Sequence, residues 1–168
     1  FRIPVRIPVE MRGREVTYHG VVSRIGCIVD LRERKNAEDR IRHLALHDPL
    51  TGLPNRALFN ERLGELTVLP EGVYGKSALL LIDLDRFKNI NDIHGHPAGD
   101  RVIKVSAERL AALAPEHSSP ARLGGDEFAL LMPGLAFAAQ AADLAFRIVT
   151  QLGLPIELQD GTQVRVGA

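Results

Sequence analysis

The sequence has few of the features that would assign it to a class at once. Among its 168 residues there is one cysteine, Cys27, which excludes an intrachain disulfide framework and is typical of a reducing compartment. The neighbours of this cysteine, Ile25, Ile28 and Val29, are apolar. We therefore expect a buried structural thiol at Cys27 and no nucleophile.

The chain also lacks an excess of charge of either sign and a long hydrophobic run. Lys plus Arg equals Asp plus Glu at 21 each, which argues against nucleic acid or an anionic membrane as the partner. No uncharged run reaches the roughly 20 residues of a membrane span, and the N-terminus lacks a signal-peptide layout. We expect a cytoplasmic domain cut from a longer protein. A membrane anchor elsewhere in that protein is compatible with this expectation.

The first half of the sequence contains two kinds of regular pattern. Residues 1 to about 30 alternate in the manner of β-strands, with a hairpin turn expected at Arg12–Glu15. The next segment is rich in helix formers, and Ala37, Ile41 and Leu44 have heptad-like spacing. This pattern predicts a charged linker helix, with parallel pairing to a second copy as an option.

The remainder predicts an α+β domain. Asn55 is expected to cap a helix, and the five apolar residues before Asp83 predict a buried strand. Pro97 suits the first turn of a later helix, and another helix is expected from about Leu135 to Leu152, with Phe137 on its apolar side. From Ala78 the order is strand, helix, helix, strand, strand, helix, strand. With the first two helices counted as one crossover, this is the ferredoxin-like βαββαβ pattern.

Acidic side chains gather where two of these strands meet. Asp83 ends one strand, and a tight turn at Gly124 and Gly125 would carry Asp126 and Glu127 to the same end of the sheet. Converging carboxylates repel one another unless a cation lies between them, and oxygen ligands completed by phosphate describe a Mg²⁺ site. The residue pattern therefore favours metal-assisted chemistry at phosphorus.

Three segments together carry a resemblance to a known family. "RLGGDEFALL", the upstream "DLDRFKNINDIHGHPAGD" and the earlier "HDPLTGLPNRALF" resemble the GGDEF domain of diguanylate cyclases, over about residues 43 to 168. The resemblance implies a nucleotidyl-cyclase-type sheet with helices packed on it. The preceding "IVDLRERKNAEDRIRHLALHD" is similar to the last strands of a PAS sensor domain and its linker helix. The implied organisation is a PAS-like remnant with its β-hairpin (1–32), a helical linker (33–47) and a GGDEF domain truncated at its C-terminus (48–168).

The resemblance implies an enzyme, a nucleotidyltransferase that condenses two GTP molecules into cyclic di-GMP, a bacterial second messenger. Each 3′-hydroxyl attacks the α-phosphate of the other nucleotide and releases pyrophosphate. Each subunit holds one GTP, so catalysis requires a homodimer. The upstream sensory module would regulate that encounter through the linker in signal transduction.

The resemblance also assigns roles to individual residues. Mg²⁺ or Mn²⁺ would be bound by Asp83, Asp126 and the backbone carbonyl of Leu84. Glu127 and Asp126 would be the catalytic acids, with Glu127 assisting the metals or deprotonating the hydroxyl. The implied substrate-binding residues are Asn91 and Asp100 at guanine, His96 lining the same site, and Phe87 and Lys88 under the phosphates.

Two departures from the family pattern modify these expectations. Where product-inhibited members carry R-x-x-D, this sequence has Pro115 and Ser118, so no inhibitory product site is expected. The chain also ends before the family's final strand and helix, so turnover by this chain alone is expected to be weak or absent. The alternative is a catalytically silent GGDEF-like module that binds GTP or product and regulates a neighbour. A phosphodiesterase domain further along the full-length protein is compatible with this sequence.

Overall fold

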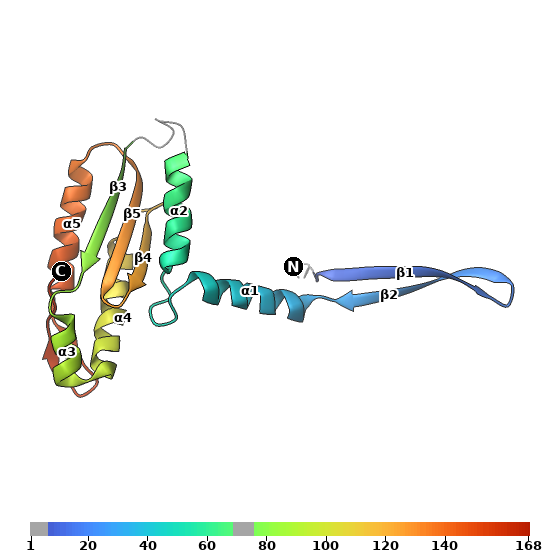
Figure 1. Ribbon diagram of the computed structural model, residues 1–168, viewed down its shortest axis with the longest axis horizontal. Coiled ribbons are helices and arrows are strands. Elements are labelled where there is room, and N and C mark those ends of the chain that lie inside the picture. The colour runs from blue at the N-terminus through green and yellow to red at the C-terminus, as the bar shows by residue number, and fades with distance from the viewer. Residues whose placement is uncertain (1–6, 69–75) are drawn as a thin grey trace, which may run out of the picture. The chain divides into compact units, whose positions relative to one another are not determined.

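The computed structural model describes residues 7–68 and 76–168. The chain divides into two compact units, Phe1–Leu44 and Ala45–Ala168. Figure 1 shows the elements of each unit. Residues 1–6, where the sequence predicts the beginning of a strand, lie outside the described residues.

The first unit contains an antiparallel hairpin of β1 (Val9–Tyr18) and β2 (Val21–Asp30). Its turn is formed by His19 and Gly20, whose φ angles of 49° and 79° are both left-handed. Two-residue hairpin turns require this conformation because it matches the twist of the flanking strands. The turn expected at Arg12–Glu15 is therefore wrong, and those residues lie inside β1.

The hairpin presents apolar side chains on both of its faces. Met11 and Ile28 lie opposite each other on one face, and Ile25 and Val29 lie on the other. All four are exposed, Met11 to 76%. Cys27 is exposed too, so the expectation of a buried thiol is wrong. That expectation relied on apolar neighbours, but a two-stranded ribbon has no second layer to cover them.

Helix α1 (Arg32–Leu46) follows the hairpin and has no buried residue. Ile41 and Leu44 are exposed to 68% and 59%. An isolated polar helix of this length is only marginally stable in water, so packing of its apolar stripe against another surface would stabilise it.

The second unit is an α+β domain built on a three-stranded antiparallel sheet, in the order β3-β5-β4. Figure 1 shows these strands side by side, with α5 beside β3 and α2 beside β4. The elements are α2 (Arg56–Val68), β3 (Lys76–Asp83), α3 (Phe87–His94), α4 (His96–Leu113), β4 (Ser119–Gly124), β5 (Glu127–Leu135), α5 (Ala139–Leu152), β6 (Ile156–Glu157) and β7 (Gln163–Val164).

The sheet has a hydrophobic layer on each face. On one face, α4 and α5 bury side chains such as Val102, Ile148, Phe128 and Leu130 in the main core. On the other face, Phe59 of α2 packs on a smaller cluster that lies over β4 and β5 and consists of Ala121, Ala129 and Leu131. We call the α2 side the outer face. Helix α2 covers only part of it, which leaves the outer face of β3 open.

The order of elements from β3 to α5 confirms the α+β class predicted from sequence. Asn55 caps α2 as expected, because its Oδ1 accepts hydrogen bonds from the Ala57 and Leu58 amides at 2.9 and 3.2 Å. Pro97 lies in the first turn of α4. The last strand, expected around Val164 and Val166, pairs with β6 and does not join the three-stranded sheet. Gly167 makes one isolated bridge with Asp85, two residues beyond the end of β3.

Two expectations about the second unit are wrong. β3 is an edge strand with alternating exposure, and Leu79 and Leu81 are exposed on the outer face. The continuous apolar run suggested burial on both sides, but α2 lies over β4 and does not reach β3. Helix α5 begins at Ala139 because residues 133–135 extend β5, and Phe137 before it is 71% exposed.

No helix among the described residues combines the length and the hydropathy needed to cross a bilayer.

Candidate functional site

The β4–β5 turn brings the acidic residues to one end of the sheet. Gly124 pairs with Glu127, so the loop consists of Gly125 and Asp126. Gly124 and Gly125 have φ angles of 146° and 53°, which strain any residue with a side chain. A Cβ on either glycine would meet no atom within 4 Å. The glycines are therefore required by the backbone of the turn, and the space above it is open.

The strand register sets two carboxylates against each other. Asp83, the last residue of β3, pairs directly with Glu127, the first residue of β5. Both side chains lie on the outer face, since the pairs Leu81–Ala129 and Leu79–Leu131 share that face. Side chains in such pairs have Cβ atoms about 5 Å apart, and like charges there repel. The structure therefore brings Asp83 and Glu127 together, as the sequence predicted.

Asp126 joins this pair through the backbone. Its carbonyl accepts a hydrogen bond from the Leu84 amide at 3.3 Å, which ties the turn to the residue after β3. The Leu84 side chain is buried in the main core and anchors this point. The turn is thus fixed to the end of β3, with Asp126 half-buried and Glu127 exposed.

Arg122 connects the turn to the loop between α1 and α2. Its guanidinium donates to the Gly125 carbonyl at 2.7 and 3.1 Å and to both Asp48 oxygens at 3.0 and 3.1 Å. The Arg122 and Asp48 side chains are only 13% and 18% exposed. Partial burial by itself raises the pKa of the Asp48 carboxyl, but hydrogen bonds from Thr51 and Arg122 outweigh it and hold that pKa below its usual value.

Arg56, the first residue of α2, makes a second connection. Its Nε donates to the Leu123 carbonyl at 3.0 Å, and its Nη2 donates to Glu127 Oε2 at 3.1 Å. Both charged side chains are more than half exposed. The turn is therefore held by two arginines, one in β4 and one in α2.

The implied substrate-binding residues lie on α3 and α4, which follow the end of β3. In α4, a Cβ on Gly99 would clash with the amide oxygen of Asn91 and lie 2.8 Å from its Cγ and 3.1 Å from Phe87 Cζ. Gly99 thus makes room for two of the predicted residues, Asn91 and Phe87. The other three, Lys88, His96 and Asp100, are exposed.

Among residues 7–68 and 76–168, no three His, Cys, Asp or Glu side chains lie close enough together to hold a metal ion. Asp83, Asp126 and Glu127 therefore do not form a cage made of protein ligands alone. A cation at this turn would need ligands from a bound molecule or water.

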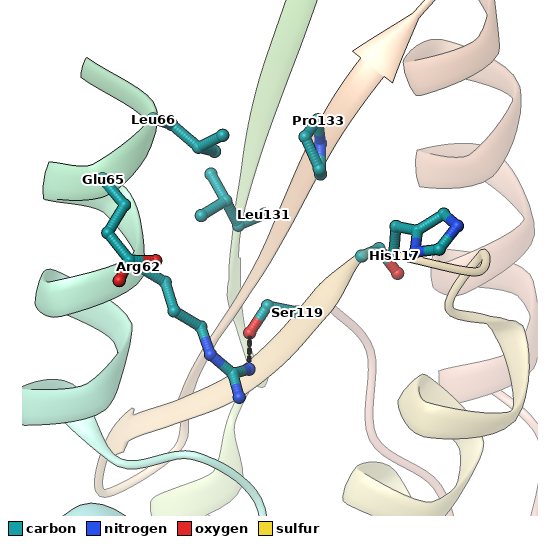
Figure 2. Close-up of a pocket in the computed structure, with 8 residues that line it drawn as sticks. Arg62, Glu65, Leu66, His117, Ser119, Leu131 and Pro133 are labelled. Atoms are coloured by element: carbon teal, nitrogen blue, oxygen red, sulfur yellow. Dashed lines mark hydrogen bonds between the residues drawn. The ribbon is translucent and has the colours of Figure 1, made fainter. Parts of the chain in front are cut away.

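A separate hollow of about 440 Å³ lies on the outer face. Figure 2 shows Arg62, Glu65 and Leu66 of α2 facing Leu131 and Ser119, with Arg62 donating a hydrogen bond to Ser119. The hollow contains none of the predicted catalytic, metal or substrate residues. Ser118, where the inhibitory pattern is missing, lines it and donates to the Pro115 carbonyl at 2.5 Å.

Comparison with known proteins assigns the family. A sequence profile described as "Diguanylate cyclase, GGDEF domain" matches residues 45–168. The chain belongs to the GGDEF diguanylate cyclase domain family. The diguanylate cyclase TpbB of Pseudomonas aeruginosa is 46% identical over 122 residues, which are 73% of this chain and 28% of that protein. An uncharacterized signaling protein of Caulobacter vibrioides is 41% identical over 167 residues, 96% of this chain and 20% of that protein.

Solved structures agree with this assignment. The coiled coil and GGDEF domain of DgcB from Caulobacter crescentus, in complex with c-di-GMP, has a TM-score of 0.75 at 26% identity, covering 82% of this chain and 73% of that one. The described fold is therefore the nucleotidyl-cyclase-type fold of GGDEF domains. The chain spans only about a fifth to a third of the length of the curated relatives it matches.

Four residues of the site were not identified from sequence. All four, Asp48, Arg56, Arg122 and Gly99, lie in the segments that carry the family resemblance. For Gly99 a signal was present, because a glycine inside a helical pattern indicates close packing. The arginine contacts have no local signal, since 74 residues separate Asp48 from Arg122.

We expect Asp48→Asn to lower the free energy of unfolding by about 1.5–3 kcal/mol near pH 7, the range for hydrogen bonds to charged groups. Since the pKa of Asp48 is lowered in the folded state, its stabilisation is present above the unfolded value near about 4 and is lost as pH falls through the folded value. Urea unfolding of both proteins at several pH values checks this.

In that experiment the difference between wild type and Asp48→Asn should shrink below about pH 4. Glu61→Gln, on the exposed side of α2, is the control and should change stability by less than about 0.5 kcal/mol. Equal stability of Asp48→Asn and wild type at pH 7 would contradict the role given to this ion pair.

Proposed function

We propose that the domain is an active diguanylate cyclase that condenses two GTP molecules into cyclic di-GMP. In each half-reaction the 3′-oxygen of one GTP bonds to the α-phosphorus of the other, the bond from that phosphorus to the β-phosphate oxygen breaks, and pyrophosphate leaves. The hydroxyl proton passes to a base at the site. The observation that carries the proposal is the register that sets Asp83 opposite Glu127, with Asp126 in the adjoining turn.

The donor set at this turn fits a divalent cation. Asp83, Asp126 and the Leu84 carbonyl are hard oxygen donors, which Mg²⁺ and Mn²⁺ accept. Mg²⁺ usually takes only one or two protein carboxylates and completes its shell with phosphate and water, consistent with the lack of a three-acid cluster. The bound cation would neutralise charge that develops on the phosphates. It would also relieve the repulsion between Asp83 and Glu127.

The remaining roles are those that the resemblance to the family implies. Glu127 is exposed beside Asp126 and would assist the metal or accept the 3′-hydroxyl proton. Asn91 and Asp100 would read guanine, because an amide and a carboxylate can match its donors and acceptors. His96 would line that site, and Phe87 and Lys88 would lie under the phosphates. Packing of Asn91 and Phe87 against Gly99 supports a fixed guanine site between α3 and α4.

Control of the site would come from the first unit and α1. The hairpin exposes apolar residues on both faces, and two strands alone are not stable, which supports its assignment as the end of a PAS-like sensor domain. The exposed stripe of Ile41 and Leu44 on α1 supports pairing with a second copy. Pairing would bring two GTP-loaded domains face to face. Pro115 and Ser118 hold each other in a turn and offer no charge to product, so no inhibitory product site is proposed there.

The direct test uses the full-length protein, incubated with GTP and Mg²⁺ and assayed for cyclic di-GMP by chromatography. We expect product from wild type and at least about a hundredfold loss of rate in Asp126→Asn, the scale for removing one preorganised group that stabilises charge. GTP binding without product from wild type would contradict the proposal and favour the silent regulatory module.

Gly99→Ala tests the guanine site separately. The added methyl group would displace Asn91 and Phe87, so we expect GTP affinity to fall about tenfold, equivalent to about 1.4 kcal/mol. The matched control is Gly64→Ala in α2, where an added Cβ meets no atom within 4 Å. Equilibrium binding of GTP measures both variants. Unchanged affinity in Gly99→Ala, or an equal loss in Gly64→Ala, would refute the site.

A further inference from the structure

The loop between α1 and α2, residues 47–55, is fixed at both of its ends. The Asn55 amide donates to the Leu46 carbonyl, and Asn55 Nδ2 donates to the Ala45 carbonyl at 2.8 Å, in the last turn of α1. Inside the loop, the Asp48 amide donates to the Leu53 carbonyl. The same Asn55 side chain caps α2. These bonds leave little freedom in where α2 begins.

The beginning of α2 in turn lies against β4. The Arg122 amide donates to the Pro54 carbonyl at 2.9 Å, and Arg56 Nε donates to the Leu123 carbonyl at 3.0 Å. The second bond fixes the plane of the Arg56 guanidinium, because that group presents its donors in a rigid fork. The remaining Nη2 then donates to Glu127 Oε2.

The contact between Arg56 and Glu127 contributes little to stability. Their side chains are 58% and 57% exposed, and exposed ion pairs of this kind add little to the free energy of unfolding. The contact instead affects the orientation of the Glu127 carboxylate. Without Arg56, Glu127 would face only Asp83 across the strand pair, and repulsion would turn its carboxylate away from the site.

We propose that Arg56 is a positioning residue that holds the Glu127 carboxylate in its working orientation at the turn. The inference rests on the proposed function, in which Glu127 assists the reaction. Arg56 acts through Glu127, and its own position is set by Asn55 and thereby by the last turn of α1. Catalysis depends steeply on such placement, since a displacement of about 1 Å can reduce a rate by a hundredfold.

Kinetics of the full-length protein test the proposal. We expect Arg56→Ala to lower kcat about tenfold while KM for GTP changes less than about twofold, because placement and not binding is lost. Arg56→Lys keeps the charge but cannot donate to Leu123 and Glu127 in the same geometry, so its rate should stay about threefold or more below wild type. Arg62→Ala, on the same helix with Ser119 as its partner, is the control and should keep the wild-type rate.

A double-mutant cycle with Glu127→Gln isolates the pair. If Arg56 acts through Glu127, Arg56→Ala should lower the rate less than about twofold in the Glu127→Gln background. The proposal is overturned by an equal loss in both backgrounds, by an equal loss in Arg62→Ala, by a wild-type rate in Arg56→Lys, or by an effect on KM alone.

A spectroscopic measurement decides the inference even if no cyclic di-GMP is made. In protein labelled with ¹³C at glutamate carboxyls, the Glu127 resonance is assigned by its absence in Glu127→Gln. We expect Arg56→Ala to shift that resonance and Arg62→Ala to leave it in place. If the wild type makes no cyclic di-GMP but Arg56→Ala still shifts the Glu127 resonance, the cyclase function is refuted and the contact between Arg56 and Glu127 is supported. A Glu127 resonance unmoved by Arg56→Ala would refute the positioning role.

Discussion

The site depends on one guanidinium. Arg122 donates to the carbonyl of Gly125 in the turn and to the carboxylate of Asp48 in the loop before α2. These side chains are largely shielded from water, so their attraction is stronger than that of an exposed pair, and removal of one partner would leave a partly buried charge. The Gly125–Asp126 turn and the start of α2 are therefore fixed relative to each other.

This connection allows the structure to keep an arrangement that is unfavourable by itself. Asp83 and Glu127 oppose each other at a sheet end, where packing alone would favour opposite charges or polar groups. Natural sequences break local rules of this kind mainly at functional sites, where stability elsewhere compensates. Here the main core beneath β5 and the contacts of Arg122 and Arg56 hold the acids where a cation and phosphates would meet them.

Local sequence signals predicted those parts of the fold that depend on local chemistry. The cap at Asn55, the placement of Pro97 and the turn at the glycines follow from the side chains and backbone freedom of single residues. The tight turn placed Asp126 and Glu127 at the same sheet end as Asp83, but the β3–β5 register that pairs Asp83 with Glu127 had no local signal. The exposure of β3 was not predictable from its apolar run, because it depends on where α2 packs. The contacts from Arg56 and Arg122 join segments far apart in sequence, and no periodic pattern encodes them.

We propose that this sheet end binds a divalent cation together with GTP. A crystal of the full-length protein with Mn²⁺ and a non-hydrolysable GTP analogue tests it most directly, because anomalous scattering locates the manganese. We expect a manganese ion with oxygens of Asp83, Asp126 and the Leu84 carbonyl each within about 2.3 Å, and analogue phosphates completing the shell. Manganese held by the phosphates alone, or at another part of the domain, would contradict it.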